Sequence, residues 1–238
     1  MEKISILIPT YNRTKFVQLC IMNILRQDYP KELLEVIILD DGNVPFLENE
    51  EYIKEVLFPI KLTYIKQKQR LTIGEKRHKL IKLSSNKIVC FMDDDDIYLP
   101  TYISYSYKTL KDNKAGLVGS NQMLFLFPHN DFKVTGIDCG EDRKYYIHEA
   151  TMMMTKKWYN SSNKFEKSSK GEGVGLIQMN DKKVFITDIR NIMICVCHQN
   201  NTIDKQRFLE HKQLEVNLDE GIKQLLLAVL LEKELTEK

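Results

Sequence analysis

The pattern of apolar and polar positions changes period repeatedly along the first 115 residues. Short, nearly continuous apolar runs predict buried strands. These runs lie at residues 4–8, 33–42, 60–67 and 87–92. Between them, apolar residues recur at helical spacing, which predicts helices. The helical segments lie at residues 12–29, 72–85 and 97–113. Asn12 or Thr14 is expected to cap the first helix, and Pro30 follows it.

This alternation of strands and helices predicts an α/β fold with an open, mostly parallel sheet and flanking helices. In such sheets, ligands bind beyond the carboxyl ends of the strands, at the point where the strand order reverses. Polar clusters follow three of the predicted strands. They are Thr10 to Arg13, Asp40 with Asp41, and Asp93 to Asp96. Their shared location predicts that they surround one binding site.

The second half of the chain is less regular. Strands are expected within residues 116–127 and 144–159, and a later strand is expected to end at His198. Residues 160–175 are rich in Ser, Asn, Gly and Lys, a composition typical of flexible loops. The tail from Leu209 onward is expected to be helical.

The tail contains the segment LLLAVLL at residues 225–231, which is too apolar for a solvated helix. We expect it to pack on the rest of the chain or on a second copy, so that a homodimer through this helix is one outcome. A membrane-surface role is disfavoured, because both signs of charge flank the segment instead of a basic face.

Composition excludes several classes of protein. The chain has 238 residues, of which 43% are apolar, and a formal net charge of +2. The apolar fraction is typical of a globular protein, and the small charge provides no field for nucleic acid. Five cysteines, mostly in apolar runs, favour free thiols in a reducing compartment over disulfides. Because we find no signal peptide and no apolar stretch of ~18 residues, we expect a cytoplasmic protein without a membrane span.

Four consecutive carboxylates, Asp93 to Asp96, follow the apolar run at 87–92. At roughly 4 Å, each like-charge pair costs on the order of 1 kcal/mol in water, so a positive group is expected beside them. Asp93 and Asp95 can point at one spot, and Mg²⁺ and Mn²⁺ prefer such oxygen ligands together with substrate phosphates. The alternative is that Asp96 caps the next helix and the others are solvated.

Several segments resemble the inverting family 2 glycosyltransferases, which have the nucleotide-diphospho-sugar transferase (GT-A) fold. Three segments that cover residues 4 to about 100 carry most of the resemblance, and a fourth lies further on. They are SILIPTYNR, EVIILDDGN, IGEKRHKLIKLSSNKIVCFMDDDDIYLP and KFEKSSKGEGVGLI. The acidic run with its following proline is similar to the Asp-x-Asp motif of that family.

The resemblance implies a GT-A domain over residues 1–205, followed by a helical tail at 206–238. Within the domain, residues 1–115 would form the nucleotide-binding half and residues 116–205 the acceptor half. The Lys-, Asn- and Ile-rich composition resembles glycosyltransferases of large DNA viruses, which would place the protein in the host cytoplasm.

The resemblance also assigns roles to residues at the strand ends. Tyr11 would lie against the base of a nucleotide-sugar, Asp93 near the ribose, and Asp95 on the Mn²⁺ or Mg²⁺ that binds the diphosphate. The residues implied for donor binding are Thr10, Tyr11, Arg13, Asp40, Asp41, Arg77, Asp93 and Asp94. Family habit favours a UDP-sugar donor and a hydroxyl acceptor on a glycan or protein. Asn43 stands where the family's usual Ser follows the acidic pair.

A carboxylate base is expected near the anomeric carbon, because an acceptor hydroxyl has a pKa far above 7. One in-line displacement then inverts that carbon, while a metal stabilises the leaving diphosphate as a Lewis acid. The resemblance points to Glu172 as the catalytic base, in a segment where Gly173 replaces the family's second acid. The competing candidates are Glu166, Glu149 and Asp142.

His198 is a further candidate metal ligand, since a late His completes the metal site in some relatives; the alternative is a local hydrogen-bonding role. A zinc site with Cys195 and Cys197 is disfavoured, because no second CxxC-type pair is present. The basic stretch at 66–79 lacks interleaved aromatic residues. It is therefore interpreted as a solvated helix face and not as a nucleic-acid site.

Two other functions stay open. A sugar nucleotidyltransferase on a similar sheet usually needs a Gly-rich phosphate loop near the N-terminus, and PTYNRTK at 9–15 has no glycine. A catalytically inactive relative that binds a nucleotide-sugar is compatible with the missing acid at Gly173. Turnover of a nucleotide-sugar in the presence of metal separates these functions from a glycosyltransferase.

Overall fold

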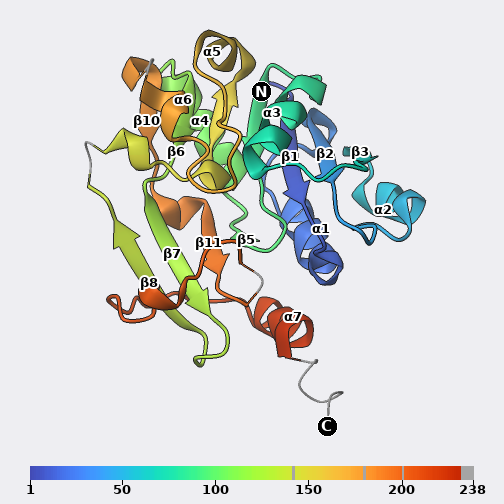
Figure 1. Cartoon of the computed structure of the whole chain (residues 1–238), viewed down its shortest axis with the longest axis vertical. Helices are drawn as coiled ribbons and strands as arrows, with labels where there is room; N and C mark the ends of the chain where they lie inside the picture. Colours follow the sequence, from blue (N-terminus) through green and yellow to red (C-terminus); the bar gives the residue numbers. More distant parts are fainter. Residues whose placement is uncertain (141–142, 179–180, 200, 232–238) are drawn as a thin grey trace.

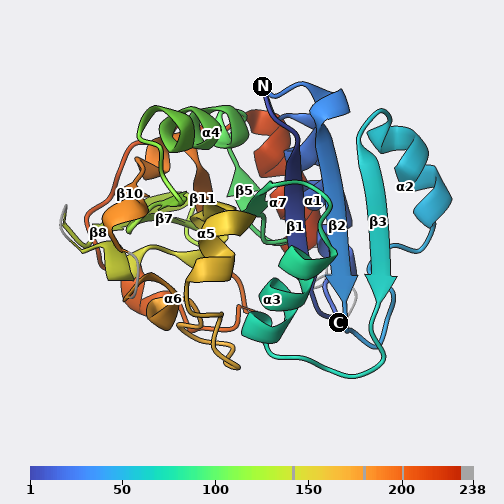
Figure 2. The same cartoon turned by 90° about the horizontal axis from the view of Figure 1, so that it is seen from above.

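The computed structural model describes residues 1–140, 143–178, 181–199 and 201–231. Within these ranges the strands form one sheet of seven strands and one of four. The larger sheet has the order β10-β6-β9-β4-β1-β2-β3, and the smaller has the order β5-β11-β7-β8. Figures 1 and 2 show the two sheets with helices around them.

The larger sheet is mostly parallel, as predicted. Its strands are β1 (Ile4–Thr10), β2 (Leu34–Asp40), β3 (Lys61–Lys66), β4 (Ile88–Phe91), β6 (Leu117–Gly119), β9 (Met153–Thr155) and β10 (Val184–Ile186). The pairs β1–β2, β2–β3, β1–β4 and β6–β10 are parallel. Strand β9 is antiparallel to both of its neighbours, β4 and β6.

The smaller sheet packs beside the larger one and comes mainly from the second half of the chain. Its strands are β5 (Ile97–Tyr98), β7 (Gln122–Phe127), β8 (Lys133–Asp138) and β11 (Met193–Val196). The α-helices are α1 (Val17–Leu25), α2 (Glu50–Leu57), α3 (Ile73–Leu83), α4 (Tyr102–Asp112), α5 (Lys156–Ser161), α6 (Val174–Gln178) and α7 (Glu220–Leu231).

The strand order reverses between β1 and β4. The chain runs outward from β1 through β2 to β3 and then returns to the other side of β1 as β4. Ligands bind at such a reversal, beyond the carboxyl ends of the two strands. Because β9 runs antiparallel to β4, the residues that precede β9 lie at the same edge of the sheet as those that follow β4. This edge therefore collects segments from both halves of the chain.

The central strands are buried on both faces, which explains their continuous apolar runs. Alternate side chains of a strand point to opposite faces. In β1, Ile6 belongs to the core that contains Leu19 of α1, whereas Leu7 belongs to a second core with Leu80 of α3. Figure 2 shows α3 on one side of β1 and α1 on the other.

The start of the first helix differs from the prediction. Neither Asn12 nor Thr14 caps α1, whose N-cap is Phe16 without a side-chain hydrogen bond. Asn12 instead has a φ of 52°, in the left-handed region, and its Oδ1 accepts a hydrogen bond from the Asn43 amide at 2.7 Å. The Asn12 side chain therefore fixes the loop after β2 and not the helix.

Three further boundaries also differ. The helix expected over 97–113 begins only at Tyr102, because the first two residues pair with β11 as strand β5. The strand within 144–159 is only β9, and α5 follows it directly. The strand expected to end at His198 ends at Val196.

Residues 160–175 were expected to form a flexible loop, but they are tied to the rest of the fold. The Gly74 amide at the start of α3 donates to the Ser168 carbonyl at 2.9 Å. Phe165 is buried and packs edge-on against Phe91 of β4, with ring centroids 5.5 Å apart. The composition of the segment could not predict these contacts, because they are made with elements far away in the sequence.

The tail is only partly helical. Residues 209–219 lie outside any helix, and Gln213 forms a β-bridge with Thr135, so the expectation of a helix from Leu209 is wrong. Helix α7 then packs on the domain, as predicted for the apolar segment, with Ile222 and Leu226 in the main core. Figures 1 and 2 show α7 beside α1.

Two further findings concern the cysteines and the helices of the described ranges. The five cysteines are free, and four of them are buried. None of the described helices combines the length and the apolar character needed to cross a bilayer.

Helix α7 should contribute to stability through Leu226, which is fully buried. We predict that Leu226→Ala lowers the free energy of unfolding by about 2–4 kcal/mol, the range for deleting a buried leucine side chain. Chemical denaturation measures this change. The control is Gln224→Ala, on the exposed side of the same helix. Equal stability of the two variants would mean that α7 does not belong to the core.

Candidate active site

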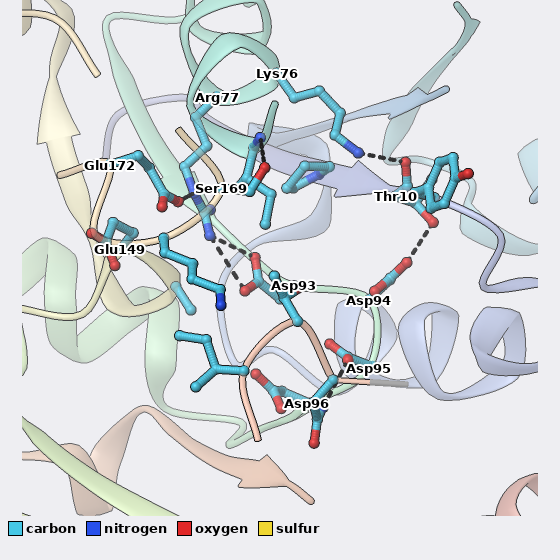
Figure 3. Close-up of a pocket in the computed structure, with 18 of the residues that line it drawn as sticks. Thr10, Lys76, Arg77, Asp93, Asp94, Asp95, Asp96, Glu149, Ser169 and Glu172 are labelled. Carbon is cyan, nitrogen blue, oxygen red and sulfur yellow. Dashed lines mark hydrogen bonds and ion pairs between the residues drawn. The ribbon is translucent and has the colours of Figure 1, made fainter. Parts of the chain in front are cut away.

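A cavity of about 730 Å³ lies at the carboxyl edge of the larger sheet, where the strand order reverses. Cavities of this size suit small molecules and cofactors. Its lining combines the end of β1, the start of α3, the acidic run after β4, the turn before β9, the loop before α6 and the segment after β11. Figure 3 shows side chains from these segments converging on the cavity.

The acidic run Asp93 to Asp96 lines the cavity, and protein groups surround it. Arg13 forms ion pairs with Asp94, at 3.4 Å, and with Asp95. Asp94 also accepts a hydrogen bond from the Thr10 hydroxyl. Burial raises the pKa of Asp94, and Arg13 and Thr10 act in the opposite direction. Arg13 thus supplies the positive charge that the sequence required beside the run.

Asp96 does not cap a helix, contrary to the alternative that the sequence left open. The N-cap of α4 is Thr101, five residues further on. Asp96 is buried, and its Oδ1 accepts a hydrogen bond from the Val196 amide of β11 at 2.9 Å. Burial raises the pKa of Asp96, and Lys205 acts in the opposite direction. Asp96 therefore connects the acidic run to the smaller sheet.

Asp93 belongs to a chain of charged groups centred on Arg77. The Arg77 Nη2 donates to Asp93 Oδ1 at 3.1 Å, and its Nε donates to Glu172 Oε1 at 3.0 Å. Arg77 is 3% exposed, and its Nη1 has no hydrogen-bond partner in the described part of the chain. Figure 3 shows Arg77 between Asp93 and Glu172. An orphaned buried donor is costly, so this nitrogen is suited to an oxygen atom of a ligand.

A pair of glutamates, Glu149 and Glu172, lines the cavity on the side away from Asp95 and Asp96. Glu149 lies on the 3₁₀ turn η4 (Glu149–Thr151) before β9, and its Oε1 accepts from the Gly173 amide at 2.9 Å. Burial raises the pKa of Glu172, Arg77 lowers it, and the neighbouring Glu149 carboxylate adds to the rise.

The acidic pair Asp40 and Asp41, at the end of β2, is not part of the cavity lining. Asp40 is fully buried and accepts hydrogen bonds from Gly42, Phe46, Tyr64 and Lys66. These contacts shape the loop after β2.

Asp41 is also buried and pairs with Lys76 at 2.8 Å. Lys76 also donates to the Thr10 carbonyl at 2.9 Å. Through Lys76, Asp41 is connected to the end of β1. Direct contact of Asp40 or Asp41 with a nucleotide stays a prediction.

Tyr11 lines the cavity beside basic groups. The Arg70 guanidinium lies 4.0 Å from the centroid of the Tyr11 ring, and the Lys76 amine lies 5.8 Å from it. A flat base next to Tyr11 would share this place with Arg70. Contact between Tyr11 and a base stays a prediction.

The predicted metal ligands are only partly brought together. His198 Nε2 lies 2.9 Å from Asp95 Oδ2, close to the roughly 3 Å that separates neighbouring ligand atoms around an octahedral Mg²⁺. Asp93 is turned to Arg77 instead. In the described ranges, no three His, Cys, Asp or Glu side chains are grouped so that they could hold a metal ion. Two of the predicted ligands, Asp95 and His198, are therefore brought together, and a metal ion bound by them stays a prediction.

A comparison with protein families identifies the chain. The family model for Glycosyl transferase family 2 matches residues 5–174. The chain belongs to this family. The uncharacterized glycosyltransferase MJ1057 of Methanocaldococcus jannaschii is 30% identical over 152 residues, which are 61% of this chain and 51% of that protein. This family 2 chain thus spans about half the length of that relative.

Solved structures share the fold of this family 2 chain. TarS 1-349 of S. aureus in complex with UDP-GlcNAc aligns with a TM-score of 0.66 at 14% identity, covering 99% of this chain and 76% of that TarS chain. The mannosyltransferase PcManGT of Pyrobaculum calidifontis, in complex with GDP-Man and Mn²⁺, aligns with a TM-score of 0.60 at 16% identity. That match covers 87% of this chain and 58% of PcManGT. These likenesses confirm the predicted GT-A fold.

The sequence placed several residues of this family 2 chain wrongly or missed them. Lys76 lies in the stretch interpreted as a solvated helix face, but it is buried. Arg77 of the same stretch, which the resemblance implied for donor binding, is also buried and lines the cavity. Residues such as His148, Asn201 and Lys205 line the cavity and were not predicted as site residues.

The competing candidates for the base differ in whether they line the cavity. Glu149 lines the cavity, whereas Glu166 does not. Asp142 lies outside the described residues.

His148 should make this family 2 protein sensitive to acid. Burial, and then Lys205, lowers the pKa of His148 from 6.5 to about 4. Between these values the unfolded chain binds more protons, so stability should fall as the pH decreases below 6.5. Between pH 7 and pH 5, the free energy of unfolding should fall in both proteins. We predict that it falls by roughly 1–2 kcal/mol less in His148→Gln than in wild type.

Denaturation at both pH values measures this difference, with His129→Gln at an exposed position as the matched control. If the stability of His148→Gln falls with pH as much as that of wild type, the pKa of His148 is not lowered in the folded protein.

Proposed function

We propose that this chain is a metal-dependent, inverting glycosyltransferase that moves a sugar from a nucleotide-sugar, in the first instance a UDP-sugar, to a hydroxyl acceptor. The observation that carries the proposal is the division of the cavity. The acidic run lies on one side, the glutamate pair lies on the other, and Arg77 connects them. This arrangement offers one place for a diphosphate and another for an acceptor.

The donor would lie along the ends of β1 and β4. Thr10, Tyr11 and Arg13 would flank the nucleotide, with Asp93 and Asp94 beyond them. Among the described residues, the Nη1 nitrogen of Arg77 is a buried donor without a partner. An oxygen atom of the donor at this point would satisfy it.

Asp95 and His198 would hold a divalent cation, Mn²⁺ or Mg²⁺. Burial lowers the pKa of His198 to about 3, and Arg13 acts in the same direction, so the imidazole is neutral at pH 7 and has a lone pair for a metal. When bound, such a cation offsets the charge that develops on the leaving diphosphate. Asp95 would then exchange its contact with Arg13 for the cation, and Arg13 would turn to a phosphate oxygen.

The acceptor would enter beside the glutamate pair. A hydroxyl group needs a base to remove its proton as it attacks the anomeric carbon. Glu149 and Glu172 are carboxylates of the cavity lining on the side away from Asp95. The base is therefore assigned to this pair, which also argues against an inactive binding protein.

UDP is the favoured nucleotide, because the structural neighbour TarS was solved with UDP-GlcNAc. PcManGT was solved with GDP-Man, so a GDP-sugar is the next donor to test. A thermal-shift panel of UDP- and GDP-sugars, each with and without Mn²⁺, identifies the donor, since a ligand that binds the folded state raises its midpoint.

The metal role rests on Asp95. We predict that Asp95→Asn weakens Mn²⁺-dependent UDP binding roughly 100-fold or more, because even the loss of groups that only orient a metal ligand costs 10–100-fold. Calorimetric titration of UDP in the presence of Mn²⁺ measures this change. The matched control is Asp112→Asn at the end of α4, where the carboxylate pairs with Lys108 at the surface. Equal UDP affinity in the two variants would refute the metal role of Asp95.

A further inference from the structure

We propose that Glu149, and not Glu172, is the general base of this protein, and that its carboxylate takes the place that an acidic side chain at position 173 would otherwise fill. The proposal rests on the proposed glycosyl transfer and names the residue that removes the acceptor's proton. Its evidence comes from the space around Gly173, from the contacts of the two glutamates and from the topology of β9.

A side chain at position 173 would collide with the Glu149 side chain. A Cβ atom built on Gly173 would lie 2.8 Å from Cγ, 2.9 Å from Oε1 and 3.2 Å from Cδ of Glu149. Contacts under 3.0 Å exclude a side chain at 173 unless Glu149 moves. The Gly173 amide also donates to Glu149 Oε1 at 2.9 Å. Glycine at 173 therefore makes room for the Glu149 carboxylate and holds it in place.

The contacts of the two glutamates differ in a way that favours Glu149. Glu172 Oε1 is held by the buried Arg77, and Glu172 is only 4% exposed. Glu149 forms no ion pair with the described residues, and its Oε2 takes no hydrogen bond from them, although Glu149 lines the cavity. A base needs an oxygen that can reach the acceptor hydroxyl. Both glutamates line the cavity and have one oxygen without a hydrogen bond from the described residues, but Glu149 is the more exposed of the two and its charge is not paired. The Glu172 charge is paired with Arg77, so Glu172 serves to position that guanidinium.

The topology explains how a residue so far from the acidic run in sequence reaches the same cavity. Strand β9 is antiparallel to β4, with Cys90 paired to Met153. The turn before β9 therefore lies beside the run that follows β4. The Met152 amide donates to the Glu149 carbonyl at 3.2 Å, which fixes the turn. Glu149 thus stands on the 3₁₀ turn η4, which leads into strand β9 of the sheet.

The transfer step follows from this placement. The acceptor oxygen attacks the anomeric carbon and forms a new carbon–oxygen bond. The bond between that carbon and the phosphate oxygen breaks, and its electron pair leaves with the nucleoside diphosphate. The acceptor proton passes to the Glu149 carboxylate, so that charge and atoms balance. With water as the acceptor, the same step is hydrolysis of the nucleotide-sugar, which can be measured before the natural acceptor is known.

The first test is Glu149→Gln, which keeps the size of the side chain and removes the base. We expect hydrolysis of the preferred nucleotide-sugar with Mn²⁺ to fall by roughly 10²-fold or more, while calorimetric binding of that nucleotide-sugar stays within about 3-fold of wild type. The matched control is Glu166→Gln, since Glu166 is exposed and lies outside the cavity lining. It should hydrolyse the donor at the wild-type rate.

The second test moves the carboxylate from one residue to the other. Glu149→Ala empties the space that a side chain at 173 would enter, and φ at Gly173 lies outside the left-handed range. We expect Glu149→Ala combined with Gly173→Asp to recover at least about a tenth of the hydrolysis lost in Glu149→Ala. The control pair, Glu149→Ala with Gly173→Ala, supplies the Cβ without the carboxylate and should recover none.

The outcomes separate the two proposals. Near wild-type hydrolysis by Glu149→Gln, with severe loss in Glu172→Gln, would overturn the assignment and make Glu172 the base. Equal recovery in the aspartate and alanine double variants would also overturn it, because a carboxylate would then not be needed. If wild-type protein hydrolyses no UDP- or GDP-sugar with Mn²⁺ or Mg²⁺ and binds none of them, the proposed function itself fails.

Discussion

The site depends on one electrostatic constraint, which is the repulsion among the four carboxylates Asp93 to Asp96. The run is tolerated because each carboxylate meets a donor from another part of the chain. Arg77 holds the first, Arg13 the two in the middle, and the Val196 amide the last. These donors come from α3, from the loop after β1 and from β11. Neutralising the run therefore fixes the positions of three elements that surround the cavity.

The same network divides the cavity into two sides. Arg77 links Asp93 to Glu172, so the acidic run and the glutamate pair are positioned by one buried guanidinium. Burial alone would lower the pKa of Arg77, but Asp93 and Glu172 raise it, and the group stays charged. A fixed positive charge between two acidic sides is suited to a diphosphate that leaves one side as an acceptor enters on the other.

Much of the first half of the fold could be predicted from the sequence, because parallel strands buried on both faces leave continuous apolar runs. The same patterns placed the acidic run at a strand end and allowed the resemblance to family 2 to be recognised. The helix start at Thr72 and Glu75 also forms the capping box that a Thr-x-x-Glu pattern predicts.

The remainder depends on tertiary contacts that leave no local pattern. Lys76 lies in a basic stretch that is typical of a solvated helix face, yet its amine is buried against Asp41. Glu149 could not be favoured over Glu172, because its place depends on the antiparallel pairing of a strand of only three residues. Asn201 and Lys205 follow β11, and the rule that polar residues after buried strands gather at a sheet edge was the one signal that could have pointed to them.

The central claim is that Asp95 changes its partner from Arg13 to a divalent cation when the donor binds. Anomalous X-ray diffraction from crystals grown with UDP and Mn²⁺ tests this claim most directly. The account predicts a manganese peak beside the Asp95 carboxylate and the His198 ring, with Arg13 turned to a phosphate oxygen. UDP bound in the cavity with Arg13 still paired to Asp95, and no manganese peak there, would contradict it.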